Sequence, residues 1–251
     1  MSYAREGSLR KHLPKIVKLD WYNKLQLLEK IVFGLKTIHE SGLVHCDLHD
    51  GNILVSDDHD ELFIIDLGLC KPINTLQNDY NVYGVLPYIA PEILRRGSYT
   101  AASDIYSFSM IMWEFTSGSP PFNDREQHNL NERPEIIEIT PPCYMNLMKK
   151  CWDSDPSKRP TIKIIEDTIS NWLIHLKKYN KAVEESAEPL VKVYHESIAN
   201  RYVDIIADNQ FGDDIKEFVR ADALKNVVSR LLDFAQLLQP ESQGSDCRIS
   251  N

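Results

Sequence analysis

Residues 45–54 of this chain read HCDLHDGNIL, and this stretch decides the fold. An acid, Asp47, and an amide, Asn52, stand five positions apart before the chain turns apolar. A second apolar run, residues 62–65, ends in Asp66 after a polar segment. Two apolar runs around a polar turn predict a β-hairpin. The hairpin would gather two acids and an amide at one end, a set of oxygen ligands suited to Mg²⁺ and a phosphate, or to one metal and one base.

A separate metal site is the alternative interpretation of the same stretch. His45 and His49 lie four positions apart in a segment rich in acids. We favour it less, because the pair lies on a predicted loop and no third soft ligand follows nearby. The acids of the turn, residues 57–60, are interpreted as solvated, and Leu54 as a core residue of a strand.

Composition narrows the class of protein. The 251 residues carry a formal net charge of −9, and 43% of them are hydrophobic. This is enough for a core in one large domain, or in one domain plus an extension. The acidic balance disfavours nucleic acid and membrane surfaces as partners, because both select a basic face. No apolar run is long enough to span a bilayer.

The cysteines and the first residues indicate the compartment. The five cysteines are scattered and form no C-x-x-C pair, which is typical of reduced thiols. The first residues show no apolar segment of the kind found in secretory signals. We therefore expect a cytoplasmic protein, with the nucleus as the other compartment.

Three motifs now point to a family. Residues 45–54 resemble the catalytic loop of protein kinases, H-R-D-L-x-x-x-N. DLG at residues 66–68 resembles the D-F-G motif, and APE at residues 90–92 follows at the expected distance. CWDSDPSKRP at residues 151–160 is similar to a run of tyrosine-kinase-like and tyrosine kinases. The resemblance is strong because the motifs stand in the right order, and it covers residues 1–176.

The resemblance implies ATP and Mg²⁺ as cofactors and gives a role to each motif residue. Asp47 would be the base that orients the substrate hydroxyl, and Asn52 and Asp66 would hold Mg²⁺. His49 stands where serine/threonine kinases usually have a lysine, and would contact the phosphates in its place. Leu54 would form the floor under the adenine.

Residues 1–9 are similar to the hinge of kinases, so that backbone groups of Ser2 and Ala4 would meet the adenine edge. An ordinary helix N-terminus, capped by Ser8, is the alternative. A hinge at this place implies that the N-terminal lobe is absent from this chain, and no G-x-G-x-x-G occurs in the sequence. We therefore expect the C-terminal lobe only, with weak or no activity for the chain alone.

Six further residues would support the site: His45, Leu67, Gly68, Glu92, Asp104 and Arg159. His45 and Leu67 would pack as pegs in the core, and Asp104 would accept backbone N–H groups of the catalytic loop. Arg159 would pair with Glu92 in a buried tie, which costs several kcal/mol when only one partner is removed.

Two further positions depart from the family pattern. Cys46 replaces an arginine that in many kinases pairs with a phosphate on the activation segment, here residues 66–92. We therefore expect no strict dependence on phosphorylation of that segment. Val85 replaces a threonine that would hydrogen-bond toward the base. The candidate acceptors in the segment are Thr75, Tyr80 and Tyr83.

Spacing of apolar residues predicts helices over residues 19–41, 103–115, 142–152 and 161–176. We expect a partial kinase domain at residues 1–176, a helical extension at 177–238 and a disordered tail at 239–251. The extension carries an apolar helical stripe from Asp213 to Leu238, which would either fold back on the lobe or bind a protein partner.

The predicted fold is mainly α with short β-hairpins, a protein-kinase-like C-lobe plus a helical C-terminal extension. The function implied is ATP-dependent phosphorylation of serine or threonine hydroxyls of a protein substrate in intracellular signalling. Serine or threonine is favoured because no A-A-R or R-A-A run follows Leu48, as tyrosine kinases would show. The alternative is a non-catalytic scaffold or protein-interaction module, since half a nucleotide cleft would hold Mg²⁺ poorly.

Overall fold

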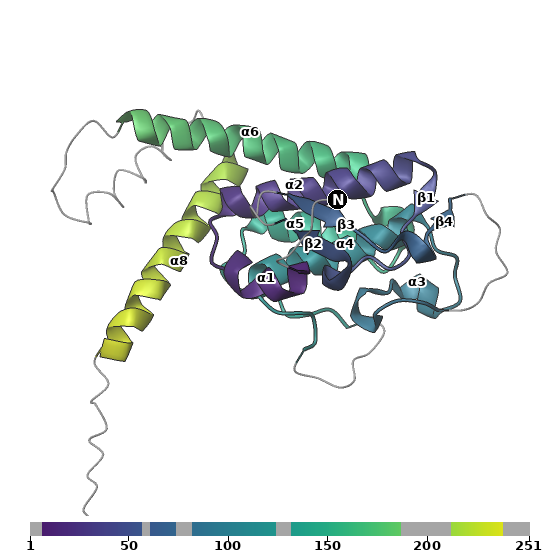
Figure 1. Ribbon diagram of the computed structural model, residues 1–251. Coiled ribbons are helices and arrows are strands. Elements are labelled where there is room, and N and C mark those ends of the chain that lie inside the picture. The colour runs from purple at the N-terminus through teal and green to yellow at the C-terminus, as the bar shows by residue number, and fades with distance from the viewer. Residues whose placement is uncertain (1–6, 57–60, 74–81, 124–131, 187–211, 238–251) are drawn as a thin grey trace, which may run out of the picture.

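The computed structural model describes residues 7–56, 61–73, 82–123, 132–186 and 212–237 (Figure 1). It is mainly helical, which confirms the predicted fold class. The helices are α1 (Leu9–Ile16), α2 (Trp21–Glu40), α3 (Pro91–Leu94), α4 (Ala101–Ser117), α5 (Pro142–Cys151), α6 (Ile162–Ser186) and α8 (Asp213–Leu237). The strands are β1 (Leu43–Val44), β2 (Ile53–Val55), β3 (Leu62–Ile64) and β4 (Lys71–Pro72).

Helix α4 is the centre of the core. Every residue from 103 to 116 in this helix is buried, because apolar side chains cover most of its circumference. Helix α2 buries only one stripe, at the three- and four-residue spacing of an amphipathic helix: Leu25, Leu28, Ile31, Val32 and Leu35. The other face of α2 stays accessible, as Phe33 illustrates with an exposure of 66%.

The predicted hairpin is present. Strands β2 and β3 pair antiparallel, with Leu54 opposite Phe63. Ile53 and Val55, which flank Leu54, are buried, whereas the side chain of Phe63 is 43% exposed. Successive side chains of a strand point to opposite faces, so the hairpin has one face on the core and one face turned away from it. β1 and β4 form a second, separate antiparallel pair.

A glycine lets the hairpin approach α2. A Cβ on Gly34 would lie 3.2 Å from Cδ1 of Ile64 in β3, tighter than most contacts of this kind. The absence of a side chain at this position therefore sets the distance between α2 and the strand pair that carries the site.

Some helices begin or end at other residues than the sequence predicts. Asp20 caps α2, since its Oδ1 accepts the N–H of Asn23 at 2.8 Å. Ser8 precedes α1 but makes no side-chain cap bond. Helix α6 runs on to Ser186, so the expected boundary at residue 176 falls inside a continuous helix. The predicted tail at residues 239–251 lies outside the described residues.

The extension folds back on the lobe. The first half of α8 packs against α2, α5 and α6 (Figure 1), and buries Ile215, Phe218, Val219 and Ala221. The ring of Phe218 lies between two indoles, 5.5 Å from Trp21 and 5.2 Å from Trp172, measured between centroids. The second half of α8 runs away from the other helices in Figure 1.

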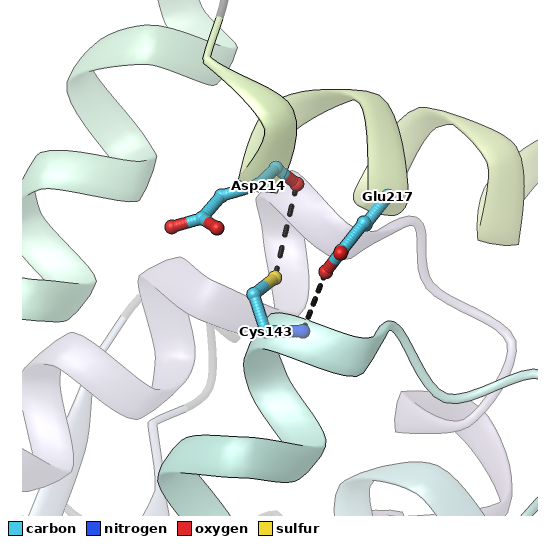
Figure 2. Close-up of side chains that lie close together, drawn as sticks. All are labelled: Cys143, Asp214 and Glu217. Carbon is cyan, nitrogen blue, oxygen red and sulfur yellow. Dashed lines mark hydrogen bonds between the residues drawn. The ribbon is translucent and has the colours of Figure 1, made fainter.

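Figure 2 shows how α8 meets the start of α5. The N–H of Cys143 donates to Oε2 of Glu217 at 2.5 Å, and the thiol donates to the carbonyl of Asp214 at 3.7 Å. The possible ligand atoms of these three residues lie within 4.8 Å of one another. However, the carboxylate of Asp214 also accepts the indole N–H of Trp172 at 2.8 Å. Burial raises the pKa of the Cys143 thiol, so we interpret the cluster as a docking contact between neutral thiol, acids and backbone.

Candidate active site

Asp104, an acid of α4, holds the backbone of the loop that follows β1. Asp104 is buried at 1% exposure and accepts the backbone N–H groups of His45 at 2.8 Å and Cys46 at 3.0 Å. Nε2 of His39 lies 2.9 Å from the same carboxylate. Cys46 itself has a φ of 70°, in the left-handed region. The buried acid therefore holds a strained residue, which turns the chain toward Asp47.

Asp47 and Asn52 lie side by side. The amide Nδ2 of Asn52 donates to the carbonyl of Asp47 at 2.9 Å and to its Oδ2 at 3.1 Å. The other carboxylate oxygen, Oδ1, is buried and has no hydrogen-bond partner within the described part of the chain. A buried acceptor without a partner is costly, so this oxygen is the one unsatisfied acceptor of the Asp47 carboxylate among the described residues.

Asp66 follows the hairpin directly. The N–H of Ile65 donates to the carbonyl of Asn52 at 2.9 Å, and this backbone bond brings the end of β3 beside Asn52. Asp66 has a φ of 60° and its Oδ1 accepts the N–H of Gly68 at 3.4 Å. The side chain is exposed, so its oxygens face outward at the same end of the hairpin as Asn52.

His45 and Leu67 lie in different surroundings. His45 is fully buried, with Nε2 at 3.1 Å from the carbonyl of Ile65. Leu67 was expected in the core as well, but its side chain is 54% exposed, and we correct this prediction. An apolar side chain is buried only where other groups pack over it, and Leu67 is not among the described residues of the hydrophobic core.

His49 stands between two acids. Its Nε2 lies 3.7 Å from Oδ1 of Asp47, and its Nδ1 lies 3.7 Å from Oδ1 of Asp50. Burial alone would lower the pKa of the ring, but the two carboxylates outweigh burial and raise the pKa to about 9. In the neutral ring, Nδ1 accepts the N–H of Gly51 at 2.9 Å. Protonation of Nδ1 would make it a donor, so it could no longer accept this bond.

Gly51 is required by this close approach. A Cβ at this position would lie 2.6 Å from Cε1 of His49, so a side chain at residue 51 would force the imidazole to move. The glycine therefore allows the imidazole to lie flat on the loop, beside Asp47.

A buried polar network that the sequence analysis did not predict supports the loop that carries Asp47 and Asp50. Arg10 of α1 binds Asp50 with both Nε and Nη2, the shortest contact being 2.6 Å. Tyr88 donates its hydroxyl to Oε1 of Glu114 at 2.5 Å. Burial, and then the charge of Asp50, raise the pKa of Glu114 well above its ordinary value. Burial and the nearby charge therefore both favour the protonated form of Glu114.

The sequence carried one signal for this network. Glu114 is the single charged residue of the run from 105 to 115, and a charge inside an apolar helix needs a partner. Its partners could not be inferred, because Tyr88 lies 26 residues away and the linked pair of Arg10 and Asp50 is 40 residues apart.

A second tie fixes the end of the activation segment. The guanidinium of Arg159 meets Glu92 with two bonds of 2.7 Å. It also donates to the carbonyls of Ala102 and Asp153 at 2.8 Å each, and its charge lies 5.2 Å from the ring centroid of Tyr106. The Arg159 side chain is fully buried, so its charge is satisfied entirely by these groups.

The structure thus brings Asp47, His49 and Asn52 together, with Asp66 adjacent through the backbone. Leu54 is half-buried and faces the same side as Phe63. Ser2 and Ala4 lie outside the described residues, as do two of the candidate phosphoacceptors, Thr75 and Tyr80. Tyr83 is described: its backbone N–H and C=O both bond to the hydroxyl of Tyr99, at 2.9 and 2.6 Å.

Comparison with known proteins gives a consistent family. A model described as "Protein kinase domain" matches residues 1–171. The chain is 31% identical over 193 residues to the serine/threonine/tyrosine-protein kinase HT1 of Arabidopsis thaliana, covering 73% of this chain and 47% of that protein. It is 30% identical over 220 residues to the human receptor-interacting serine/threonine-protein kinase 1, covering 77% of this chain and 32% of that protein.

A third relative is the dual serine/threonine and tyrosine protein kinase of Xenopus laevis, 31% identical over 182 residues, which are 67% of this chain and 19% of that protein. The chain spans less than half the length of each of these relatives. Among the helices in the described part of the chain, none has the length and apolar character needed to cross a membrane.

Proposed function

Because this chain belongs to the protein kinase family, we propose that it takes part in the transfer of the γ-phosphoryl group of ATP to a hydroxyl of a protein substrate. The family uses ATP with Mg²⁺ and acts on proteins. The observation that carries the proposal is the buried Oδ1 of Asp47, which has no partner among the described residues while its Oδ2 is held by Asn52.

In this proposal Asp47 orients the attacking hydroxyl. Its free oxygen would accept the hydroxyl proton of the substrate, and the amide of Asn52 holds the carboxylate in place. The backbone bonds from the loop to Asp104 fix the height of the loop above α4. Catalysis of this kind depends on positioning and on fixed charges rather than on covalent chemistry.

Asn52 and Asp66 fit a magnesium ion. Both offer hard oxygen atoms, as Mg²⁺ requires. The amide nitrogen of Asn52 points to Asp47, which leaves its oxygen for a cation, and the carboxylate of Asp66 is exposed beside it. When bound, Mg²⁺ would neutralise charge on the phosphates.

His49 would supply the positive charge that a lysine supplies in other serine/threonine kinases. The two acids that flank the ring raise its pKa to about 9, so the ring is cationic at neutral pH and suited to a phosphate oxygen. Adenine would lie on Leu54, with its edge toward the backbone of Ser2 and Ala4. Serine and threonine remain the proposed acceptors.

Binding of Mg²⁺-ATP tests the proposal on the purified chain. We expect Mg²⁺-ATP to raise the melting temperature of the wild type, and Asp66→Asn to abolish the shift. Asp167→Asn is the matched control, because Asp167 is an exposed acid on α6. Transfer of γ-labelled phosphate to casein should then be lost in Asp47→Asn. The absence of any shift in the wild type would reject nucleotide binding by this chain and favour the non-catalytic alternative.

The non-catalytic alternative, a protein-interaction module, has its own supporting observation. Phe63 and Leu67 are 43% and 54% exposed, on the hairpin end that carries the site. An apolar surface of this kind is typical of a face covered by another polypeptide. Under this alternative, light scattering would show that the wild type associates with another polypeptide and that Phe63→Glu does not. The fold of the variant would stay intact.

A further inference from the structure

A cavity of about 190 Å³ lies where α8 meets the lobe. Its lining comes from the start of α2, from the segment before α5 and from α8. Three of the lining side chains are the lysines Lys18, Lys24 and Lys225, and no acid is among the described residues that line it. The cavity shares no residue with the candidate active site.

Lys24 is the most buried of the three lysines, at 4% exposure. Its ammonium lies 4.7 Å from the ring centroid of Trp21, and it makes no hydrogen bond or ion pair within the described ranges. Asp222, whose charge acts on Lys24, is already engaged, since its carboxylate accepts the N–H of Trp21 at 3.1 and 3.2 Å. A buried cation without an anionic partner is costly.

Thr140 adds a second unsatisfied group to the same cavity. It is 7% exposed, and its hydroxyl oxygen has no hydrogen-bond partner in the part of the chain that the structure describes. Most buried polar atoms in proteins have a partner, and an exception indicates a bound water or ion. A hydroxyl and an ammonium therefore both lack a partner at one place.

Lys225 brings the charge of α8 to the cavity. Its Nζ donates one bond to the carbonyl of Leu19 at 2.6 Å, and an ammonium has two further N–H groups to give. We propose that the cavity binds a small oxyanion of the phosphate or sulfate class, held by Lys24, Lys225 and the hydroxyl of Thr140. Lysine binds such anions as a point charge.

The consequence is a link between α8 and the lobe. Lys225 belongs to α8, whereas Lys24 and Thr140 belong to the lobe, so one anion would contact both. Water alone could also fill the cavity, but a neutral molecule would add no negative charge beside Lys24 and Lys225. The bound anion would therefore hold α8 against the lobe.

Calorimetric titration of the full chain with sodium sulfate, at constant ionic strength set with chloride, tests the proposal. We expect saturable binding in the wild type and about tenfold weaker binding in Lys24→Met and Thr140→Val. Lys149→Met is the matched control, since Lys149 is an exposed lysine of α5 outside the cavity. Circular dichroism checks that each variant is folded, and Lys225→Met offers a second cation to remove.

Absence of saturable binding in the wild type, or unchanged binding in Lys24→Met, would overturn the proposal. Sulfate should also slow hydrogen exchange of residues 213–226 in the wild type and not in Lys24→Met. Orthophosphate and glycerol 3-phosphate, titrated in the same way, separate a free ion from a phosphate ester. Tighter binding of the ester identifies an organic ligand, and equal binding identifies the free ion.

The pH dependence gives an independent readout. Burial, and then the charge of Lys225, lower the pKa of Lys24 to about 8, against the opposing pull of Asp222 and Asp20. Burial raises the pKa of Asp222 to about 6, so Asp222 is ionised above that pH. Sulfate affinity should therefore fall as the pH rises from about 7 to about 9, because the neutral amine of Lys24 loses the anion.

Discussion

At the scale of single residues, the tie between Glu92 and Arg159 makes the sharpest prediction. Glu92→Gln would leave a fully buried guanidinium without its counter-charge, and removal of one partner of such a pair costs about 3–5 kcal/mol. We expect the free energy of unfolding in urea to fall by about that amount. Glu40→Gln is the control, because Glu40 is 67% exposed and lies 3.8 Å from Lys36, where a loss below about 1 kcal/mol is expected. Similar losses in both variants would contradict the prediction.

The lowered pKa of Asp50 predicts that the protein loses stability in acid. Burial alone would raise its pKa, but bonds from His49 and Arg10 lower it to about 2. A carboxyl with a lowered pKa stabilises the fold above its unfolded pKa, near pH 4, and loses this contribution as the pH falls toward 2. The contribution is about 1–2 kcal/mol. Urea unfolding at about pH 5 and about pH 2.5 should show a smaller change in Asp50→Asn than in the wild type.

The co-location of Asp47, His49 and Asn52 could be predicted, because they belong to one motif with fixed distances along the chain; their roles stay a prediction. The residues that were missed, Arg10, Tyr88 and Glu114, make tertiary contacts whose partners are far apart in sequence. Leu67 was misplaced for a related reason. Its apolar character predicts burial only where a second layer covers it, and sequence spacing does not reveal such a layer.

At the scale of elements, spacing of apolar residues predicted the helices well, since α2 and α5 keep one buried stripe each. The end of α6 was not predictable in the same way. Leu173, Leu176 and Tyr179 continue the buried spacing, so the helix has no stop signal at residue 176. Burial there depends partly on α8, which packs on α6 from some forty residues further along the chain.

Docking of α8 gives the prediction at this scale. Phe218 is fully buried between Trp21 and Trp172, so Phe218→Ala should leave a cavity and cost about 3–5 kcal/mol. We expect faster hydrogen exchange in residues 213–226 and a lower melting temperature. Leu224→Ala serves as control, because Leu224 lies on the same helix and is 55% exposed. Unchanged exchange in Phe218→Ala would show that α8 is held by its polar contacts instead.

At the scale of the whole molecule, two buried thiols report on global unfolding. Cys46 and Cys151 are 7% and 0% exposed. Burial, reinforced by the charge of Asp104, raises the pKa of Cys46 to about 12, and burial also raises that of Cys151. Neutral, inaccessible thiols do not react with iodoacetamide. We expect mass spectrometry to find both unmodified in the native protein at about pH 8, and modified together with increasing urea. Rapid native labelling of Cys46 would show that the catalytic loop opens locally.

Two acids of α8 accept backbone N–H groups at the starts of two other helices. Asp222 accepts the first N–H of α2, at Trp21, and Glu217 accepts an N–H in the first turn of α5, at Cys143. Both acids therefore lie at the positive ends of helix dipoles, where a negative charge is stabilising. A recombinant fragment that stops at residue 176 would leave both helix ends without these acceptors. The boundary of a well-behaved expressed fragment should accordingly be set beyond residue 226, although the resemblance to kinases stops about fifty residues earlier.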